Sequence, residues 1–277
     1  MRLSASALGP LVDVRVPRHG VVHSVFARAV NLRVGAELWT VLGHEGNDAA
    51  LTIRLAPGQD VGMVARRAGG SVHVRSGHLG VGSSVIDCRI APRWTPDPYG
   101  PAEPGIPARA SALELDARRH AWAGSWQLAR DVAAALGSPS PRSGERLDDV
   151  VRHVVGRGPG LTPAGDDVLV GVLAVLTSPA ADPASAVLVD RLRSALQPTL
   201  ASTTDVSRAL LEQAASGHPS RAVWDLVRGL LAGRGVTDVT DPGGRVLGMG
   251  ATSGGDTCAG ILAASRLMFR SLEGIAA

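Results

Sequence analysis

The first third of the chain consists of short apolar runs, rich in Val and Ile, separated by Gly, Asn and Asp. This punctuation is typical of β-strands joined by tight turns. The run at 50–55 also alternates in part between apolar and polar positions, as a half-buried strand does. The expected strands lie at 21–25, 38–42, 50–55, 71–74 and 85–90. Residues 1–92 are therefore expected to form a small β barrel or sandwich domain.

The C-terminal part, 111–277, places its apolar residues at helical spacing instead. The expected helices lie at 112–136, 145–155, 165–177, 184–196, 203–216, 219–232 and 256–272. Ser111 precedes Glu114 at the spacing of a capping box, which indicates that the first helix begins there. Prolines fall between these segments or at their starts, where helices tolerate them. The pattern predicts an α+β chain whose N-terminal β domain is followed by a mostly α-helical domain.

The segment that joins the two parts is rich in proline. Residues 92–107 include six prolines and two glycines. Such a sequence forms neither a helix nor a central strand, because proline lacks the backbone N–H that both need. Residues 93–110 are therefore expected to be a linker, or an extended arm that lies over the surface.

Composition narrows the range of functions. Hydrophobic residues make up 45% of the chain, enough for a sizeable core. All 28 basic residues are Arg, which excludes chemistry that needs a P-loop lysine or a Schiff-base lysine. The net charge is only +3 and no basic run exceeds a pair, so nucleic acid is not an expected partner. The sequence shows neither an apolar stretch long enough to span a bilayer nor the charged-then-apolar pattern of a signal peptide. We therefore expect a cytoplasmic protein with no membrane partner.

One short motif occurs twice in the helical part. Residues 160–167 read Gly-Leu-Thr-Pro-Ala-Gly-Asp-Asp, and residues 250–257 read Gly-Ala-Thr-Ser-Gly-Gly-Asp-Thr. Both fit Gly-x-Thr-x-x-Gly-Asp, and we call them the first turn and the second turn. An apolar run follows each, with a further glycine, Gly171 or Gly260, where a neighbouring helix can pack closely. The sequence therefore predicts two equivalent helix starts.

Helix starts offer unsatisfied backbone N–H groups and a partial positive field, and glycines let an anion approach the backbone. We expect the substrate-binding residues to come from four places: Arg157 and Gly158 just before the first turn, Gly160, Thr162 and Gly165 within it, Thr252, Ser253, Gly254 and Gly255 in the second turn, and Thr203, Thr204 and Ser207 in the block that opens the helix at 203–216. The candidate catalytic residues are Asp166, Asp167 and Asp256, which can act as general bases or hold magnesium. The structural alternative is that these residues only cap helices and form turns.

Three blocks of the sequence, 156–167, 203–207 and 250–257, resemble the signature blocks of a bacterial family that includes the AllH-like subunit of oxamate carbamoyltransferase. Residues 22–32 are similar to the N-terminal β region of that family. The resemblance implies a role in allantoin (purine nitrogen) catabolism, in a complex of several subunits that interconverts oxalurate plus phosphate with oxamate plus carbamoyl phosphate. Gly255 and Ala251 depart from the bulkier residue and the His associated with the family, and each change is expected to open the wall of the second turn.

The resemblance implies small anionic substrates and other subunits as partners. On this hypothesis the first turn, with Arg157, binds one anion, and the second turn binds the other. Asp166 or Asp256 would orient an amide N–H or a phosphate bound to magnesium; the residues require no cofactor, and magnesium is the candidate that they could hold.

Two alternatives remain open. Residues 254–260 are also similar to the magnesium motif of ADP-ribosylglycohydrolases, but Cys258 stands where that motif has a further Asp. Cys258 also follows the second turn at a helix start, where a thiol pKa tends to fall and a catalytic thiol could form, but the sequence favours a small buried residue there. The other alternative is a non-catalytic scaffold subunit that binds a small carboxylate.

Overall fold

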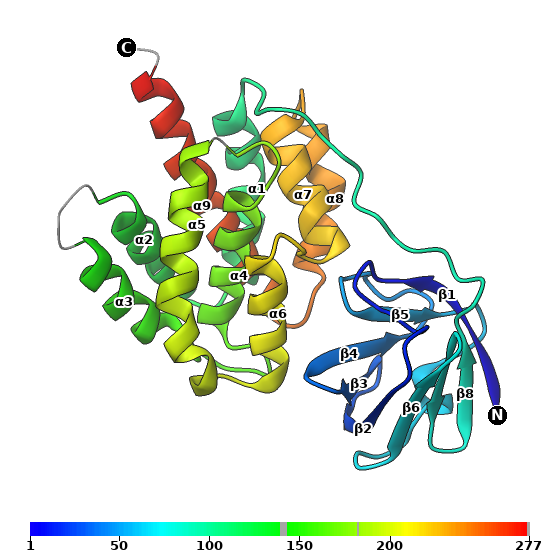
Figure 1. Cartoon of the computed structure of the whole chain (residues 1–277). Coiled ribbons are helices and arrows are strands. Elements are labelled where there is room, and N and C mark those ends of the chain that lie inside the picture. The colour runs from blue at the N-terminus through cyan, green and yellow to red at the C-terminus, as the bar shows by residue number, and fades with distance from the viewer. Residues whose placement is uncertain (139–142, 182, 276–277) are drawn as a thin grey trace. The chain divides into compact units, whose positions relative to one another are not determined.

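The computed structural model describes residues 1–138, 143–181 and 183–275. The chain divides into two compact units, Met1–Asp97 and Pro98–Ala277, and each has its own hydrophobic core. The first unit is built of strands and the second of helices (Figure 1). The predicted α+β fold class, with a β barrel followed by helices, is confirmed.

The first unit is a closed barrel with the strand order β1-β5-β4-β3-β2-β6-β7-β8. Its strands are β1 (Arg2–Leu8), β2 (Arg18–Val25), β3 (Ala29–Val34), β4 (Glu37–Leu42), β5 (Thr52–Leu55), β6 (Ser71–Arg75), β7 (His78–Val81) and β8 (Ser84–Asp87), with a 3-10 turn, η1 (Val61–Met63), after β5. The pairs β1–β8 and β4–β5 are parallel, and the other neighbours are antiparallel. Closure leaves no unpaired sheet edge.

The barrel interior is filled by alternate side chains of the strands, such as Trp39, Ile53 and Ile86, all with no exposed surface. All five strands expected from the sequence are present, although the one at 85–90 ends at Asp87. The strands β1, β3 and β7 were not predicted. β7 is only four residues long and contains a glycine, so its local pattern is weak, and its pairing with β6 and β8 decides its conformation.

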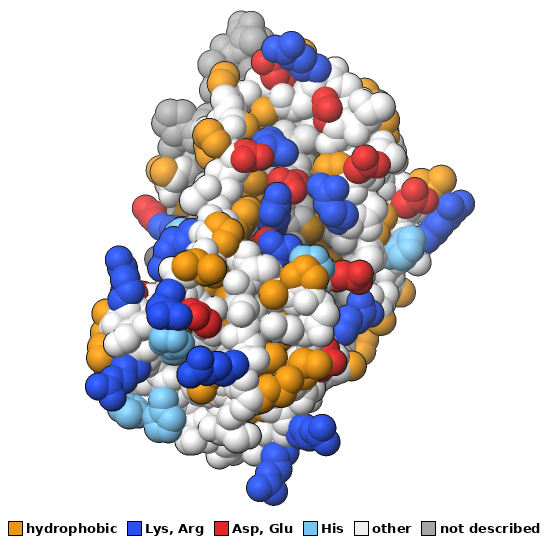
Figure 2. All heavy atoms as spheres, turned by 90° about the vertical axis from the view of Figure 1, so that its right-hand side faces the viewer, with side chains coloured by type: hydrophobic (Ala, Val, Ile, Leu, Met, Phe, Trp, Pro, Cys, Tyr) orange, Lys and Arg blue, Asp and Glu red, His pale blue; other side chains and the backbone are white. Residues whose placement is uncertain are grey.

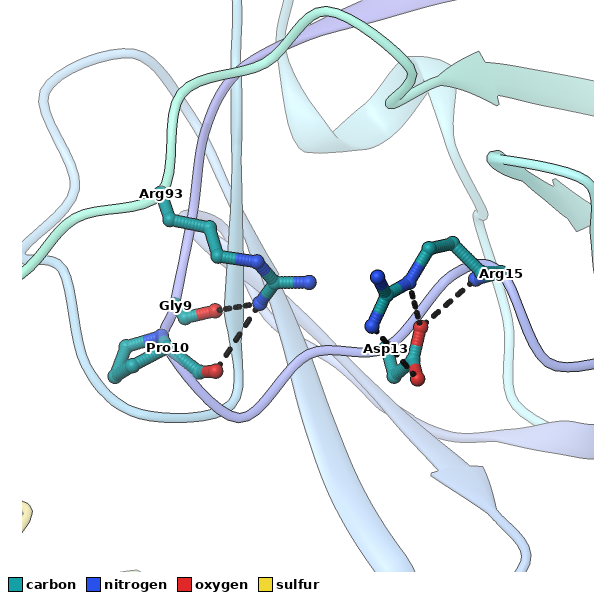
Figure 3. Close-up of polar contacts among 5 residues, drawn as sticks. All are labelled: Gly9, Pro10, Asp13, Arg15 and Arg93. Atoms are coloured by element: carbon teal, nitrogen blue, oxygen red, sulfur yellow. Dashed lines mark hydrogen bonds and ion pairs between the residues drawn. The ribbon is translucent and has the colours of Figure 1, made fainter.

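The chain that leaves the barrel is tied back to the loop after β1 (Figure 3). Arg93 Nη1 donates to the carbonyl oxygens of Gly9 and Pro10, at 3.1 Å each. In the same loop the guanidinium of Arg15 binds the Asp13 carboxylate and lowers the pKa of Asp13. The two hydrogen bonds of Arg93 hold the beginning of the proline-rich segment against the barrel.

The second unit is helical throughout. Its elements are α1 (Ile106–His120), α2 (Ser125–Leu136), α3 (Ser143–Val154), α4 (Ala164–Leu176), α5 (Pro183–Leu196), η2 (Gln197–Ser202), α6 (Asp205–Ala215), α7 (Arg221–Ala232), α8 (Thr237–Leu247) and α9 (Ser253–Ile275). The structure corrects the expected helix at 112–136, which is two helices, α1 and α2. Ser111 lies inside α1 and caps nothing, because α1 already begins at Ile106, within the segment expected to be linker. The helix α8 was not predicted, since it contains Pro242.

The residues before α1 lie on the helical unit. The Glu103 N–H donates to Leu231 O at the end of α7. The side chain of Arg109 is 2% exposed, and its guanidinium donates to the carbonyls of Pro104, Glu103, Leu230 and Leu231. Burial lowers the pKa of Arg109. One buried arginine thus fixes the proline-rich arm on α7 through backbone carbonyls alone.

The helices α4 and α9 cross at the centre of the helical unit (Figure 1). A Cβ atom on Gly171 of α4 would lie 2.1 Å from Thr257 O of α9, and one on Gly260 of α9 would lie 2.0 Å from Val168 O of α4. Both helices therefore need glycine at the crossing so that their backbones can touch. This confirms the close packing expected at these two glycines.

Figure 2 shows one face of the molecule, on which arginine side chains are interspersed with carboxylates. Arginines also form ion pairs within one helix, such as Arg118 with Glu114 and Arg119 with Asp116. Such pairs contribute little to stability, on the order of 0.5 kcal/mol each. Within the described residues, no helix combines the length and apolar character that a membrane crossing requires.

Candidate functional site

The two turns meet in space. The first turn leads into α4 and the second into α9, and Thr162 Oγ1 lies 2.9 Å from Ser253 Oγ, within hydrogen-bond distance. The crossing at Gly171 and Gly260 accounts for this, because it brings the starts of both helices to the same end of the pair. The prediction that the two turns come together is confirmed.

The Asp166 carboxylate is completely buried at the start of α4 and is held by donors from two other segments. Its Oδ1 accepts from the Gly156 N–H at 2.8 Å. Its Oδ2 accepts from Ser207 Oγ at 2.7 Å and from Thr203 Oγ1. A buried carboxylate with a donor on each oxygen is stabilised as a structural anchor. The geometry therefore gives Asp166 a bracing role.

The block 203–207 is also brought to the first turn. Thr204 caps α6 by accepting from the Ser207 N–H at 3.1 Å, and its hydroxyl donates to Leu161 O at 2.7 Å. With Thr203 and Ser207 on Asp166, each hydroxyl of the block contacts the first turn. The blocks 156–167 and 203–207 thus form one hydrogen-bonded unit, and the third block, which is the second turn, joins it through Ser253.

Asp256 is the counterpart of Asp166 in the second turn and is 1% exposed. Its Oδ1 accepts from the Trp122 N–H at 2.8 Å and from Ser125 Oγ at 2.6 Å. Its Oδ2 is buried and has no hydrogen-bond partner among the described residues. Sequence reasoning missed Trp122 and Ser125, because they precede Asp256 by more than 130 residues and no local signal links them.

Asp167 is the last residue of the first turn, and it is 5% exposed. Burial raises its pKa well above the usual value for an aspartate; the hydroxyls of Ser253 and Thr162 lower it by less, and the charges of Asp256 and Asp166 raise it further. Its Oδ2 is buried and accepts no hydrogen bond from the described residues. Asp167 therefore carries a carboxyl group that can hold a proton and has a free oxygen next to the paired hydroxyls.

The glycines of the turns serve a different purpose from the one expected. A Cβ on Gly165 would lie 2.0 Å from Val154 O, and one on Gly254 would lie 1.9 Å from Val246 O. These glycines admit the backbone of neighbouring helix ends, where the sequence analysis expected an anion. A Cβ on Gly255 would lie 2.4 Å from Ala121 N. The expectation that Gly255 opens the wall of the second turn is therefore wrong, because backbone already fills that space.

Several backbone N–H groups at the start of α4 already donate to backbone carbonyls. The Gly165 N–H donates to Arg157 O at 2.8 Å, and the N–H groups of Asp166 and Asp167 donate to Pro163 O. These amides are not the free donors that the sequence analysis expected. By contrast, the N–H groups of Thr162 and Ser253 meet no acceptor in the described part of the chain.

The remaining candidates lie near the surface. Gly158 and Gly160 adopt φ angles of 100° and 103°, which favour glycine and turn the chain toward α4. Arg157 and Gly160 are exposed, and Thr252 is half-buried. The residues before and within the first turn thus leave a guanidinium and loop backbone exposed.

Metal and thiol chemistry find no supporting geometry in the described residues. They contain no group of three or more His, Cys, Asp or Glu side chains that could hold a metal ion. Cys258 is completely buried, and burial raises its pKa to about 12. The interpretation of Cys258 as a small buried residue, favoured over a catalytic thiol, is confirmed, and desolvation raises the thiol pKa where a helix start alone would lower it.

Comparison with known families gives two matches. Residues 154–265 match the family described as oxamate carbamoyltransferase subunit AllH, and residues 4–93 match the AllH family N-terminal domain. The first match spans both turns and the block 203–207, and the second covers the barrel. Comparison with curated proteins and with solved structures found no match.

Proposed function

Because the chain belongs to the AllH family, we propose that it is a subunit of an oxamate carbamoyltransferase that interconverts oxalurate plus phosphate with oxamate plus carbamoyl phosphate in allantoin breakdown. The observation that supports a site in this chain is the Thr162–Ser253 hydroxyl pair, 2.9 Å apart, beside the buried Asp167 carboxyl. Other subunits of the complex are its proposed partners, and the substrates are small anions.

The reaction places one demand that this site can meet. A phosphate oxygen attacks the ureido carbonyl carbon of oxalurate, and the bond from that carbon to the oxamate nitrogen breaks. The departing nitrogen must take up a proton, because an amide anion is a poor leaving group. In the proposed step Asp167, whose pKa burial raises, donates this proton, and in the reverse direction it removes one from the oxamate amide.

The neighbouring groups suit the charge that develops on the carbonyl oxygen. The hydroxyls of Thr162 and Ser253, with their unused backbone N–H groups, supply donors from two helix starts. Donors of this kind stabilise an oxyanion without any lysine. The exposed Arg157 is the proposed partner of the substrate carboxylate or phosphate. In this proposal Asp166 and Asp256 position the two turns and do not touch the substrate.

The test is carbamoyl phosphate formation from oxalurate and phosphate, measured with the chain alone and with its partner subunits. We expect Asp167→Asn to lower kcat by on the order of a hundredfold, because the asparagine side chain cannot act as a general acid toward the departing nitrogen. Ser253→Ala should lower kcat by about tenfold through loss of one donor. Size-exclusion chromatography of the complex must show unchanged assembly for both variants.

The matched controls are Asp190→Asn and Ser194→Ala, which alter exposed side chains of α5. Both should keep full activity. If Asp167→Asn also keeps full activity in an assembled complex, the proposed proton transfer is wrong. The chain would then be a binding or scaffold subunit whose partners carry the chemistry.

A further inference from the structure

A pocket of about 980 Å³ opens in the helical unit, away from both turns. Its walls come from α1, α2, α5 and α9, and none of the turn residues lines it. This volume lies at the upper end of the range for pockets that bind small molecules. The proposed function makes no use of this pocket.

The pocket combines an apolar interior with arginines. Leu188 and Leu267 line it together with several alanines, and Val187, also in the lining, is 62% exposed. Arg118, Arg130 and Arg266 supply the charges. Arginine stems cover apolar surface while their guanidinium groups stay in water, so such a lining is apolar inside and cationic at the edge.

The positive charge of the pocket is only partly balanced. The Glu114 carboxylate pairs with both Arg118 and Arg266. Arg130 donates to Gln127 Oε1 at 2.6 Å and meets no carboxylate among the described residues. Three guanidinium groups therefore share one carboxylate. A guanidinium next to an apolar wall favours an anionic group at that position.

The indole of Trp126 fixes one of these arginines. The Arg118 guanidinium carbon lies 4.1 Å from the centre of the Trp126 ring, a cation–π contact. Trp126 is 8% exposed, and its Nε1 has no hydrogen-bond partner in the described part of the chain. This wall of the pocket thus has a guanidinium that the Trp126 ring positions.

From this combination we propose that the pocket binds a small amphipathic carboxylate, with an aliphatic or aromatic body against Leu188 and Leu267 and its carboxylate at Arg130. Oxamate and oxalurate have no apolar body, so this ligand is distinct from the substrates of the proposed function. The pocket is a second site of the subunit, for a ligand of a different chemical class.

Octanoate is the probe, and calorimetric titration of the purified full chain is the measurement. We expect saturable binding with one molecule per chain and a change in tryptophan fluorescence, because Trp126 lines the pocket. Arg130→Gln should weaken binding on the order of tenfold, because it removes the guanidinium that meets no carboxylate among the described residues. Ala134→Trp should abolish binding, because it places an indole in the pocket from an exposed position that tolerates a large side chain.

Arg152→Gln is the matched control, since Arg152 is an exposed arginine of α3 that does not line the pocket. It should bind octanoate as the unchanged chain does. Octanol, which lacks the charge, should bind at least tenfold more weakly. Equal binding of octanol, or unchanged octanoate binding in folded Ala134→Trp, would overturn the proposal. Because binding alone is measured, the outcome does not depend on carbamoyltransferase activity.

Discussion

The first and second turns have the same sequence pattern but differ in how their carboxylates are satisfied. Asp166 accepts hydrogen bonds on both oxygens, whereas Asp256 accepts on Oδ1 only. After these residues the turns diverge, since Asp167 in the first corresponds to Thr257 in the second. The Thr257 hydroxyl donates to Ser253 O at 2.8 Å, as an ordinary helical threonine does. Only the first turn thus contributes a third carboxyl, that of Asp167, and burial raises its pKa.

The shared part of the motif has a common structural role. Asp166 accepts the N–H of Gly156, just beyond the end of α3, and Asp256 accepts the N–H of Trp122, just beyond the end of α1. Each also accepts from a serine at the start of another helix. In each turn the aspartate of the Gly-Asp pair therefore links its own helix to two others through hydrogen bonds. The proposed proton transfer lies where the two copies differ, at Asp167.

The largest expected effect is the loss of Asp166. Asp166→Ala leaves the Gly156 N–H and two hydroxyls buried without an acceptor, so the free energy of unfolding should fall by about 3 to 5 kcal/mol. Asp256→Ala should cost less, about 2 to 3 kcal/mol, because two donors are orphaned and one carboxylate oxygen is already unpaired. Urea denaturation measures both. A greater loss for Asp256→Ala would contradict the comparison.

The helix crossing should be the next most sensitive feature. Gly171→Ala places a Cβ 2.1 Å from Thr257 O, so α4 and α9 must separate, at a cost of about 2 to 3 kcal/mol. The matched control is Gly244→Ala in α8, where a Cβ would meet nothing within 4 Å. That change should raise stability by up to about 1 kcal/mol through helix propensity. Thermal unfolding separates the two outcomes, and equal effects would show that the crossing tolerates a side chain.

The extra carboxyl of the first turn should give a distinctive pH dependence. Because the folded-state pKa of Asp167 is raised, the folded chain binds this proton more tightly than the unfolded chain. Its contribution to stability is present below the unfolded pKa of about 3.9 and is lost as the pH rises toward the folded pKa, by at most about 1.4 kcal/mol per pH unit. Asp167→Asn should remove this loss, and Asp190→Asn should not. Denaturant midpoints between pH 4 and 8 measure it, and parallel curves would contradict a raised pKa.

The smallest expected effect concerns the bridge between the turns. Thr162→Val and Ser253→Ala should each cost about 1 kcal/mol, and the double variant less than their sum, because both remove the same hydrogen bond. Thr252→Val removes the equivalent hydroxyl of the second turn, which has no partner in the described residues, and should change stability by less than about 0.5 kcal/mol. Strict additivity of the first pair would mean that the hydroxyls do not interact.

Local patterns were sufficient to predict most of the fold. The barrel, five of its strands and the helices α3 to α7 and α9 follow from turn residues and apolar periodicity, and the structure ends these elements within about two or three residues of the expected bounds. The division between α1 and α2 did not follow, because helix-forming residues such as Ala121 and Trp122 occupy it. Their conformation is set by Asp256, whose carboxylate takes the Trp122 N–H. Helix α8 did not follow from the sequence either, because Pro242 locally disfavours a helix. The helix α8 packs on α7, and this tertiary contact cannot be read from the local pattern.

The sequence by itself determined which residues form the two turns, because the Gly-x-Thr-x-x-Gly-Asp pattern is contained within eight positions. Only the tertiary structure decided their roles. The donors to Asp256 come from 134 and 131 residues away, and Ser253 reaches Thr162 across 91 residues. Burial, which raises the pKa of Asp167, arises only when α4 and α9 pack together. Hydrogen-bond partners and desolvation depend on neighbours in space, and a linear pattern does not contain them.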